Sequence, residues 1–130
     1  MLFRRKPRVE APILHAYDDD FDELLGAEKG VALVDFWAPW CAPCHMMERI
    51  IDEVAIEQAD RGVRILKVEV DQAPETSERF EVKSIPTLVF FLDGEPQFEM
   101  VGPVPKPVLE REISVLLGEK VDTDEPTQQA

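Results

Sequence analysis

Two cysteines, Cys41 and Cys44, stand close together in the stretch VDFWAPWCAPCHMM, residues 34–47, and the chain has no others. C-x-x-C beside a strand–helix pattern is typical of thiol–disulfide exchange, and C-x-x-C-H, completed here by His45, is typical of covalent haem attachment. A close cysteine pair can also supply half of a metal site. A purely structural disulfide is disfavoured, because a cross-link over so short a loop removes little entropy from the unfolded chain. The pair therefore indicates chemistry.

The position of Cys41 favours a reactive thiol. A thiolate, rather than a thiol, attacks a disulfide, so the attacking cysteine needs a lowered pKa and exposure to solvent. We expect Cys41 at the junction of an apolar strand and a helix, where free N–H groups and the helix dipole favour an anion. Cys44, one turn later, is expected to be more buried and able to resolve a mixed disulfide. Pro43 suits a first helical turn, because it has no N–H to lose, and stiffens the dithiol loop.

Asp35 is a second chemical signal. It lies inside VALVDFW, residues 31–37, an otherwise apolar run that predicts a buried strand. An ionised carboxylate is costly in such surroundings, so Asp35 should have either a raised pKa or a partner. Trp37 continues this strand and should pack near the cysteines, whereas Trp40 is expected to form an exposed apolar lip for substrate peptides.

Hydrophobic patterning places these residues in one α/β domain. Strands are predicted over residues 12–17, 31–37, 63–70, 86–92 and 95–101, and helices from Phe21 to a stop at Gly30 and over residues 41–58, 74–82 and 106–118. The Asp run at residues 18–20 is expected to N-cap the first helix, and Asp93-Gly94 to turn the last hairpin. The order β-α-β-α-β-α-β-β-α predicts a three-layer α/β/α domain with a central mixed sheet.

Length and charge limit the function classes. The 130-residue chain suffices for one domain, and its net charge of −13 is unevenly placed. We expect a disordered basic arm over residues 1–10, the folded domain over 11–118 and a disordered acidic tail over 119–130. The acidic body argues against nucleic acid or an anionic membrane as the main partner. No apolar run suffices to span a membrane, and the basic N-terminus lacks a signal-peptide core, so a cytoplasmic location is expected.

Three segments resemble the thioredoxin family. VALVDFWAPWCAPC at residues 31–44 is similar to its strand–WCxxC–helix signature, LKVEVD at 66–71 to its third strand, and SIPT at 84–87 to its cis-proline loop. The likeness extends from about Leu14 to Leu117 and implies the thioredoxin fold. It implies reduction of protein disulfides through Cys41 and Cys44, with disulfide-containing clients and a thioredoxin-reductase-type electron donor as partners. We expect a monomer with no metal and no cofactor beyond the redox-active disulfide.

The resemblance also assigns roles to residues around the cysteines. Asp35 would lie behind Cys44 and exchange protons with it as general base and later proton donor. Lys67 matches the lysine that the family places near this acid. Ala42 stands where the commonest family form has Gly, and should stiffen the reduced loop slightly.

Two further loops are implied to contact substrates. A cis Ile85–Pro86 bond would turn the backbone of Ile85 toward the dithiol, where it could pair with an extended client chain. Gly102 matches the third contact loop of the family, where a backbone comes close. Pro103, Pro105 and Pro107 crowd the chain after Gly102, where the family is usually less rigid, so the choice of partners is expected to be unusual.

Rival chemistries find less support. Covalent haem would need His45 as an axial ligand and a distal ligand that nothing singles out, and would leave the acidic residue in the apolar strand unexplained. Zinc would require two ligands besides the cysteines, and the two histidines, His15 and His45, stand at no familiar spacing. A domain that keeps the fold but only binds a dedicated partner is the remaining alternative.

Overall fold

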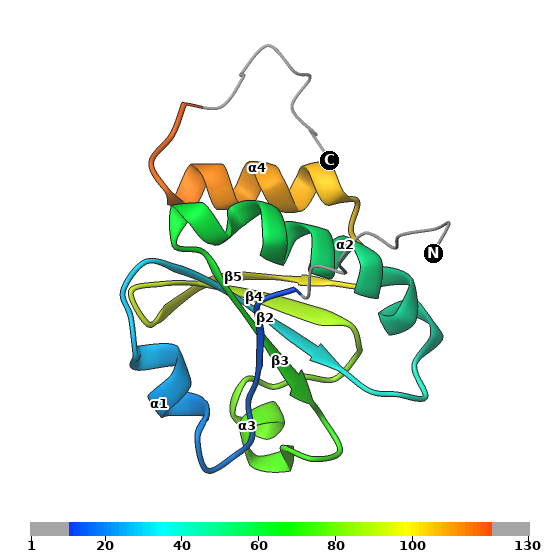
Figure 1. Ribbon diagram of the computed structural model, residues 1–130. Coiled ribbons are helices and arrows are strands. Elements are labelled where there is room, and N and C mark those ends of the chain that lie inside the picture. Colours follow the sequence, from blue (N-terminus) through cyan, green and yellow to red (C-terminus); the bar gives the residue numbers. More distant parts are fainter. Residues whose placement is uncertain (1–10, 121–130) are drawn as a thin grey trace, which may run out of the picture.

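The structure, a computed structural model, describes residues 11–120, and its elements follow the predicted order (Figure 1). They are β1 (Ile13–His15), α1 (Phe21–Gly26), β2 (Val31–Trp37), α2 (Ala42–Gln58), a 3₁₀ turn (Ala59–Arg61), β3 (Arg64–Glu69), α3 (Pro74–Arg79), β4 (Thr87–Leu92), β5 (Glu95–Val101) and α4 (Lys106–Leu116). The predicted basic arm over residues 1–10, and residues 121–130 of the predicted acidic tail, lie outside the described residues.

The strands form one mixed sheet in the order β1-β3-β2-β4-β5. The central strand β2 runs parallel to β3 and antiparallel to β4, while β1 extends the parallel side. β5 pairs antiparallel with β4 and forms the opposite edge. The predicted parallel centre and antiparallel hairpin edge are both confirmed.

Helices cover both faces of this sheet, with α2 and α4 on one face and α1 and α3 on the other (Figure 1). Successive side chains of a strand point to opposite faces. Leu33 of β2 accordingly packs with Met47 and Ile51 of α2, whereas Val34 packs on the opposite face with Phe21 of α1. Both faces of β2 are buried, which explains its nearly continuous apolar sequence. The three-layer α/β/α architecture is confirmed.

The β4–β5 hairpin turns at Asp93 and Gly94, as predicted. Both residues have positive φ, 51° and 83°, as a type I′ turn requires. The carboxylate of Asp93 also accepts a 2.7 Å hydrogen bond from the backbone N–H of Gly30, directly before β2. The hairpin is thereby tied to the start of the central strand.

Two predictions about α1 are wrong. The helix ends at Gly26 rather than near Gly30, and the side chain of its N-cap residue, Asp20, makes no capping hydrogen bond. The carboxylate of Asp20 instead accepts a 2.7 Å hydrogen bond from the backbone N–H of Tyr17. Asp side chains readily stabilise such local turns, and this competes with capping.

The Asp run caps a different helix. The carboxylate of Asp18 accepts hydrogen bonds from the N–H groups of Glu75 at 3.2 Å and Thr76 at 2.8 Å, and from the Thr76 hydroxyl at 2.7 Å. N–H groups in the first turn of a helix have no partner inside it, and Ala73 at the N-cap of α3 offers no side-chain acceptor. Asp18 therefore fastens the loop before α1 to the start of α3.

Replacing Asp18 by Ala should lower the free energy of unfolding, because N–H groups in the first turn of α3 then lose their side-chain acceptor. Asp18→Asn keeps an acceptor oxygen and should retain part of this free energy. Urea denaturation followed by circular dichroism measures the change. The exposed neighbour Asp19 provides the matched control, since Asp19→Ala should shift stability by less than about 0.5 kcal/mol. Equal losses in the two Ala variants would contradict the capping role.

Candidate active site

Cys41 occupies the N-cap of α2, at the strand–helix junction predicted for it. Its backbone is extended, with φ −93° and ψ 107°, and Ala42 and Pro43 begin the helix. The N–H of Cys44 donates a 3.2 Å hydrogen bond to Sγ of Cys41. This N–H and the positive end of the helix dipole both favour negative charge on the Cys41 sulfur in a reduced pair.

Cys41 and Cys44 are joined by a disulfide, with their Cα atoms 5.3 Å apart. The expectation of an exposed Cys41 is wrong for this oxidised form, because Cys41 is only 5% exposed and Cys44 is 3% exposed. The cause is packing, since Ala38, Trp37 and Ile85 surround the two sulfurs. The surface at the disulfide is therefore formed mainly by the residues around it rather than by the two sulfurs.

The loops at Ile85 and Gly102 meet beside this disulfide. The Ile85–Pro86 peptide is cis, as expected. The carbonyl oxygen of Ile85 lies 3.7 Å from Sγ of Cys41, a packing contact, since a disulfide sulfur carries no hydrogen to donate. Gly102 has φ +91°, and its N–H donates a 2.8 Å hydrogen bond to the carbonyl of Pro86. A Cβ at Gly102 would meet nothing within 4 Å, so the backbone there lies open to an approaching chain.

Trp40 forms the exposed lip predicted from the sequence, with 68% of its surface accessible. Its indole N–H donates a 2.7 Å hydrogen bond to the carboxylate of Asp71, which holds the ring in place. Asp71 was not predicted from the sequence to lie at this site. Its position just beyond β3 was a usable signal, because the carboxyl ends of the parallel strands β2 and β3 lie at the same edge of the sheet.

Asp35 and Lys67 are buried side by side in the sheet, as register partners of β2 and β3. Burial raises the pKa of Asp35 to about 6, the charge of Lys67 opposes this rise, and the charge of Glu48 adds to it. Oδ1 of Asp35 has no hydrogen-bond partner among the described residues. The Lys67 ammonium lies over the ring of Trp37, 4.5 Å from its centroid. Of the two possibilities left open for Asp35, the raised pKa is therefore confirmed.

Strand alternation places Asp35 on the α2 side of the sheet. Leu33, two residues earlier, packs against α2 from this face, and side chains two apart share a face. On α2, Cys44, Met47 and Ile51 are buried at the spacing of one helical face. Asp35 and Cys44 thus lie on the surfaces of β2 and α2 that face each other.

His45 is held by two acceptors. Its Nε2 lies 2.6 Å from the carbonyl oxygen of Pro39, and its Nδ1 lies 3.0 Å from a carboxylate oxygen of Glu48. An imidazolium can donate to both, and these two hydrogen bonds raise the pKa of His45. With His45 engaged in this way and the cysteines bonded to each other, the arrangement is that of a thiol–disulfide site rather than of a haem-attachment site.

The zinc alternative requires two ligands in addition to the cysteines. Among residues 11–120, no three or more His, Cys, Asp or Glu side chains are grouped so that they could hold a metal ion. Nor does this part of the chain contain a helix that combines the length and the apolar character needed to cross a membrane.

Known proteins have sequences similar to that of this chain. The thioredoxin family model matches residues 12–115. Thioredoxin from Staphylococcus epidermidis is 48% identical over 94 residues, which cover 72% of this chain and 88% of that protein. The chloroplastic M-type thioredoxin of Pisum sativum is 42% identical over 96 residues, which cover 74% of this chain and 55% of that protein, so the chain spans about half of the pea sequence. This chain belongs to the thioredoxin family.

Proposed function

We propose that this chain reduces disulfide bonds of client proteins, with Cys41 as the attacking cysteine and Cys44 as the resolving one. It is a thiol–disulfide oxidoreductase, and the observation that carries the proposal is the Cys41–Cys44 disulfide at the N-cap of α2. A helix N-terminus lowers the pKa of a thiol and makes it reactive. The alternative, a domain that only binds a partner, is not favoured, because it gives this cysteine pair no role.

Exchange proceeds in two steps. The Cys41 thiolate attacks one sulfur of the client disulfide, forming a Cys41–client disulfide while the other client sulfur leaves as a thiolate. The Cys44 thiolate then attacks the Cys41 sulfur, forming the Cys41–Cys44 disulfide and releasing the second client thiolate. Two electrons pass to the client, and the chain ends in the oxidised form described above.

Asp35 acts as the proton acceptor for Cys44. The supporting observations are its place on the surface of β2 that faces the buried side of α2, and a pKa of about 6 caused mainly by burial. A group whose pKa lies near the working pH can both accept and return a proton. Lys67 limits the rise in the pKa of Asp35 through its charge, and so keeps the carboxylate available near neutral pH.

Clients are recognised by the surface around the disulfide. Trp40 supplies an exposed aromatic face, and the backbone of Ile85 beside Cys41 can pair with an extended client chain. The open space over Gly102 allows a close approach. Ala42 and Pro43 hold the loop between the cysteines at the start of α2.

Electrons reach this site from a thioredoxin-reductase-type donor. The small Ala42-Pro43 pair between the cysteines supports a reductant rather than an oxidant. The chain then works as a monomer, in a reducing compartment such as the cytoplasm, where thiols are kept reduced. The disulfide serves as its only redox group, without a metal or a further cofactor.

Cys44→Ser should convert the chain into a trap. Cys41 can still attack, but the second step has no nucleophile, so a mixed disulfide between Cys41 and an insulin chain accumulates. Intact-mass spectrometry before and after dithiothreitol measures the adduct. Cys41→Ser should abolish insulin-disulfide reduction and form no adduct. Wild-type activity in Cys41→Ser would refute the enzymatic proposal.

The Cys41–Cys44 pair of the wild-type protein should be oxidised and reduced as a two-electron couple. Its midpoint potential should be about −270 mV, a value characteristic of thioredoxin. Equilibration in graded dithiol–disulfide buffers, followed by alkylation and intact-mass measurement, gives the fraction carrying two labels. A midpoint potential above about −150 mV, close to the potentials of strong oxidants, would instead indicate that the chain forms disulfides in its clients.

Asp35→Asn should slow disulfide reduction at pH 7 by roughly 10²-fold, the scale of a lost general base. Because the carboxyl group titrates near pH 6, the wild-type rate should rise through this pH, and the variant should lack this rise. Stopped-flow measurement of the second step between pH 5 and 8 gives the profile. Identical profiles for wild type and variant would exclude the proton relay.

Asp35→Asn should also stabilise the oxidised protein at pH 8 by about 3 kcal/mol. Burial raises the pKa of Asp35 from its ordinary value of 3.8 to about 6, so the native state binds this proton more tightly than the unfolded state does. The contribution of the group to stability is complete below pH 4 and is lost as the pH rises through 6. Denaturant unfolding of the two proteins at pH 4 and pH 8 should show a gain only at the higher pH.

A further inference from the structure

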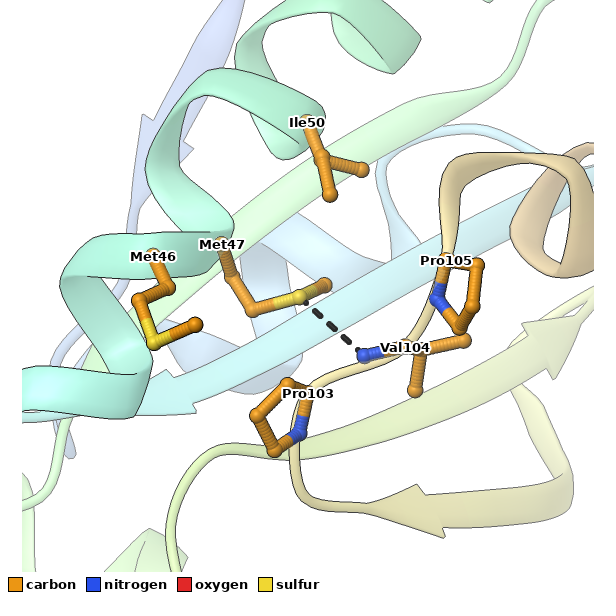
Figure 2. Close-up of a pocket in the computed structure, with 6 residues that line it drawn as sticks. All are labelled: Met46, Met47, Ile50, Pro103, Val104 and Pro105. Carbon is orange, nitrogen blue, oxygen red and sulfur yellow. Dashed lines mark hydrogen bonds between the residues drawn. The ribbon is translucent and has the colours of Figure 1, made fainter.

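An apolar groove lies between α2 and the loop that joins β5 to α4 (Figure 2). Its lining residues are Met46, Met47 and Ile50 from the helix and Pro103, Val104 and Pro105 from the loop. The buried side chains of Met47 and Val104 form its floor, where the N–H of Val104 points at the Met47 sulfur from 3.2 Å. Met46, on the helix side, is 69% exposed. The groove therefore offers an apolar surface to solvent.

The two walls differ in stiffness. Pro103 and Pro105 have fixed φ angles and no N–H, and the only N–H between them, that of Val104, is engaged by Met47. The loop wall is consequently rigid and offers a ligand no backbone N–H donor. The helix wall contains Met46, an unbranched thioether that adapts to different apolar shapes. Such a pair of walls suits apolar side chains of varied form.

The size of the groove indicates what fits. The volume of this open groove is about 250 Å³. A cavity of about 150 Å³ is large enough for benzene, whereas sites for drug-sized ligands start at about 300 Å³. One Leu, Met or Phe side chain is therefore a better match than a cofactor or metabolite.

The charged residues near the groove give no reason to expect a charged ligand. The charged residues next to the lining residues in sequence each have an ion-pair partner (His45 with Glu48, Arg49 with Glu53, and Lys106 with Glu53 and Glu57). Each cation thus has a carboxylate within ion-pair distance. The positive and negative charges beside the groove therefore offset one another, so we expect a ligand to be selected by its apolar character.

The groove continues the client surface described above. Met46 follows Cys44 by two residues, and Pro103 directly follows Gly102, whose N–H is bonded to the Pro86 carbonyl. Met46 and Ile50 stand five and nine residues after Cys41, which corresponds to about 7–14 Å along the helix axis. An extended chain covers this span in about two to four residues.

We propose that this groove binds one apolar side chain of the client, about two to four residues away from the cysteine that Cys41 attacks. The inference rests on the proposed disulfide reduction and adds a side-chain preference to a site that otherwise contacts the client backbone. The preferred client is an extended polypeptide with Leu, Met or Phe at that distance from its reactive cysteine.

The test uses a Gly/Ser host peptide with one cysteine activated as its 2-pyridyl disulfide, and a single Leu moved from five residues before the cysteine to five after it. Reaction with the reduced Cys44→Ser protein forms the Cys41–peptide disulfide and releases 2-thiopyridone, whose absorbance gives the rate. Leu at one or two positions should raise the second-order rate constant about tenfold over the Ser host. Met46→Glu should reduce this gain to less than about twofold.

Three controls accompany this measurement. Met46→Leu keeps an apolar wall and should retain most of the gain. Ile56→Glu introduces the same charge at another exposed position of α2, where Ile56 is 40% exposed, and should leave the gain intact. The rate with the small reagent 2,2′-dipyridyl disulfide should be equal in all variants, since it does not reach the groove.

Any other result contradicts the inference and also identifies the reason. Equal Leu gains in Met46→Glu and its parent mean that the groove is not used. A faster reaction of every peptide with Met46→Glu means that a second copy or another segment of this chain already fills the groove, and sedimentation distinguishes these two. Failure of the small reagent to react with Cys41 would instead refute the proposed function itself.

Discussion

Burial of β2 on both faces is the constraint on which the site depends. Because α2 and α4 cover one face and α1 and α3 the other, the strand has a fixed position at the centre of the sheet. The chain leaves its end and starts α2 within a few residues, so Cys41 is held at a helix N-terminus. The same burial desolvates Asp35 and raises its pKa. One architectural feature thus creates both the environment of Cys41 and that of Asp35.

Three separate chain segments make the surface around the disulfide. The α2 start, the Ile85–Pro86 loop and the Gly102 loop are distant in sequence. The Cys41 sulfur contacts the Ile85 carbonyl, and a backbone hydrogen bond joins Gly102 to Pro86. Because the sulfurs themselves are nearly covered, the exposed surface at this site belongs mainly to these neighbours. The proline-rich continuation of the third loop carries this surface into an apolar groove, where a side chain can add to backbone recognition.

Electrostatic interactions link the surface of α2 to the buried acid. Glu48 pairs with His45 on the outside and also raises the pKa of Asp35 from a distance. Loss of the proton from His45 leaves the charge of Glu48 uncompensated. Glu48 thus acts electrostatically on one group at the surface and on one group inside the sheet. The first turns of α2 therefore influence both Cys41 and Asp35 electrostatically.

The sequence by itself determined the order of elements and the chemistry of the cysteine pair. Binary patterning predicted the strands and helices, because helix and strand periods differ, and a carboxylate in an apolar strand indicated a raised pKa. Local signals were sufficient where cause and effect lie within a few residues, as at the Asp93-Gly94 turn.

Only the tertiary structure decided which distant groups meet. The Asp run looks like the cap of the helix that follows it, yet Asp18 caps α3, and Asp71 holds Trp40 from another strand end. Ile85, far along the chain, is one of the residues that cover Cys41. Such contacts follow from strand order and packing, which single-residue preferences do not encode. Patterning predicts what each segment forms, and the fold decides what each side chain touches.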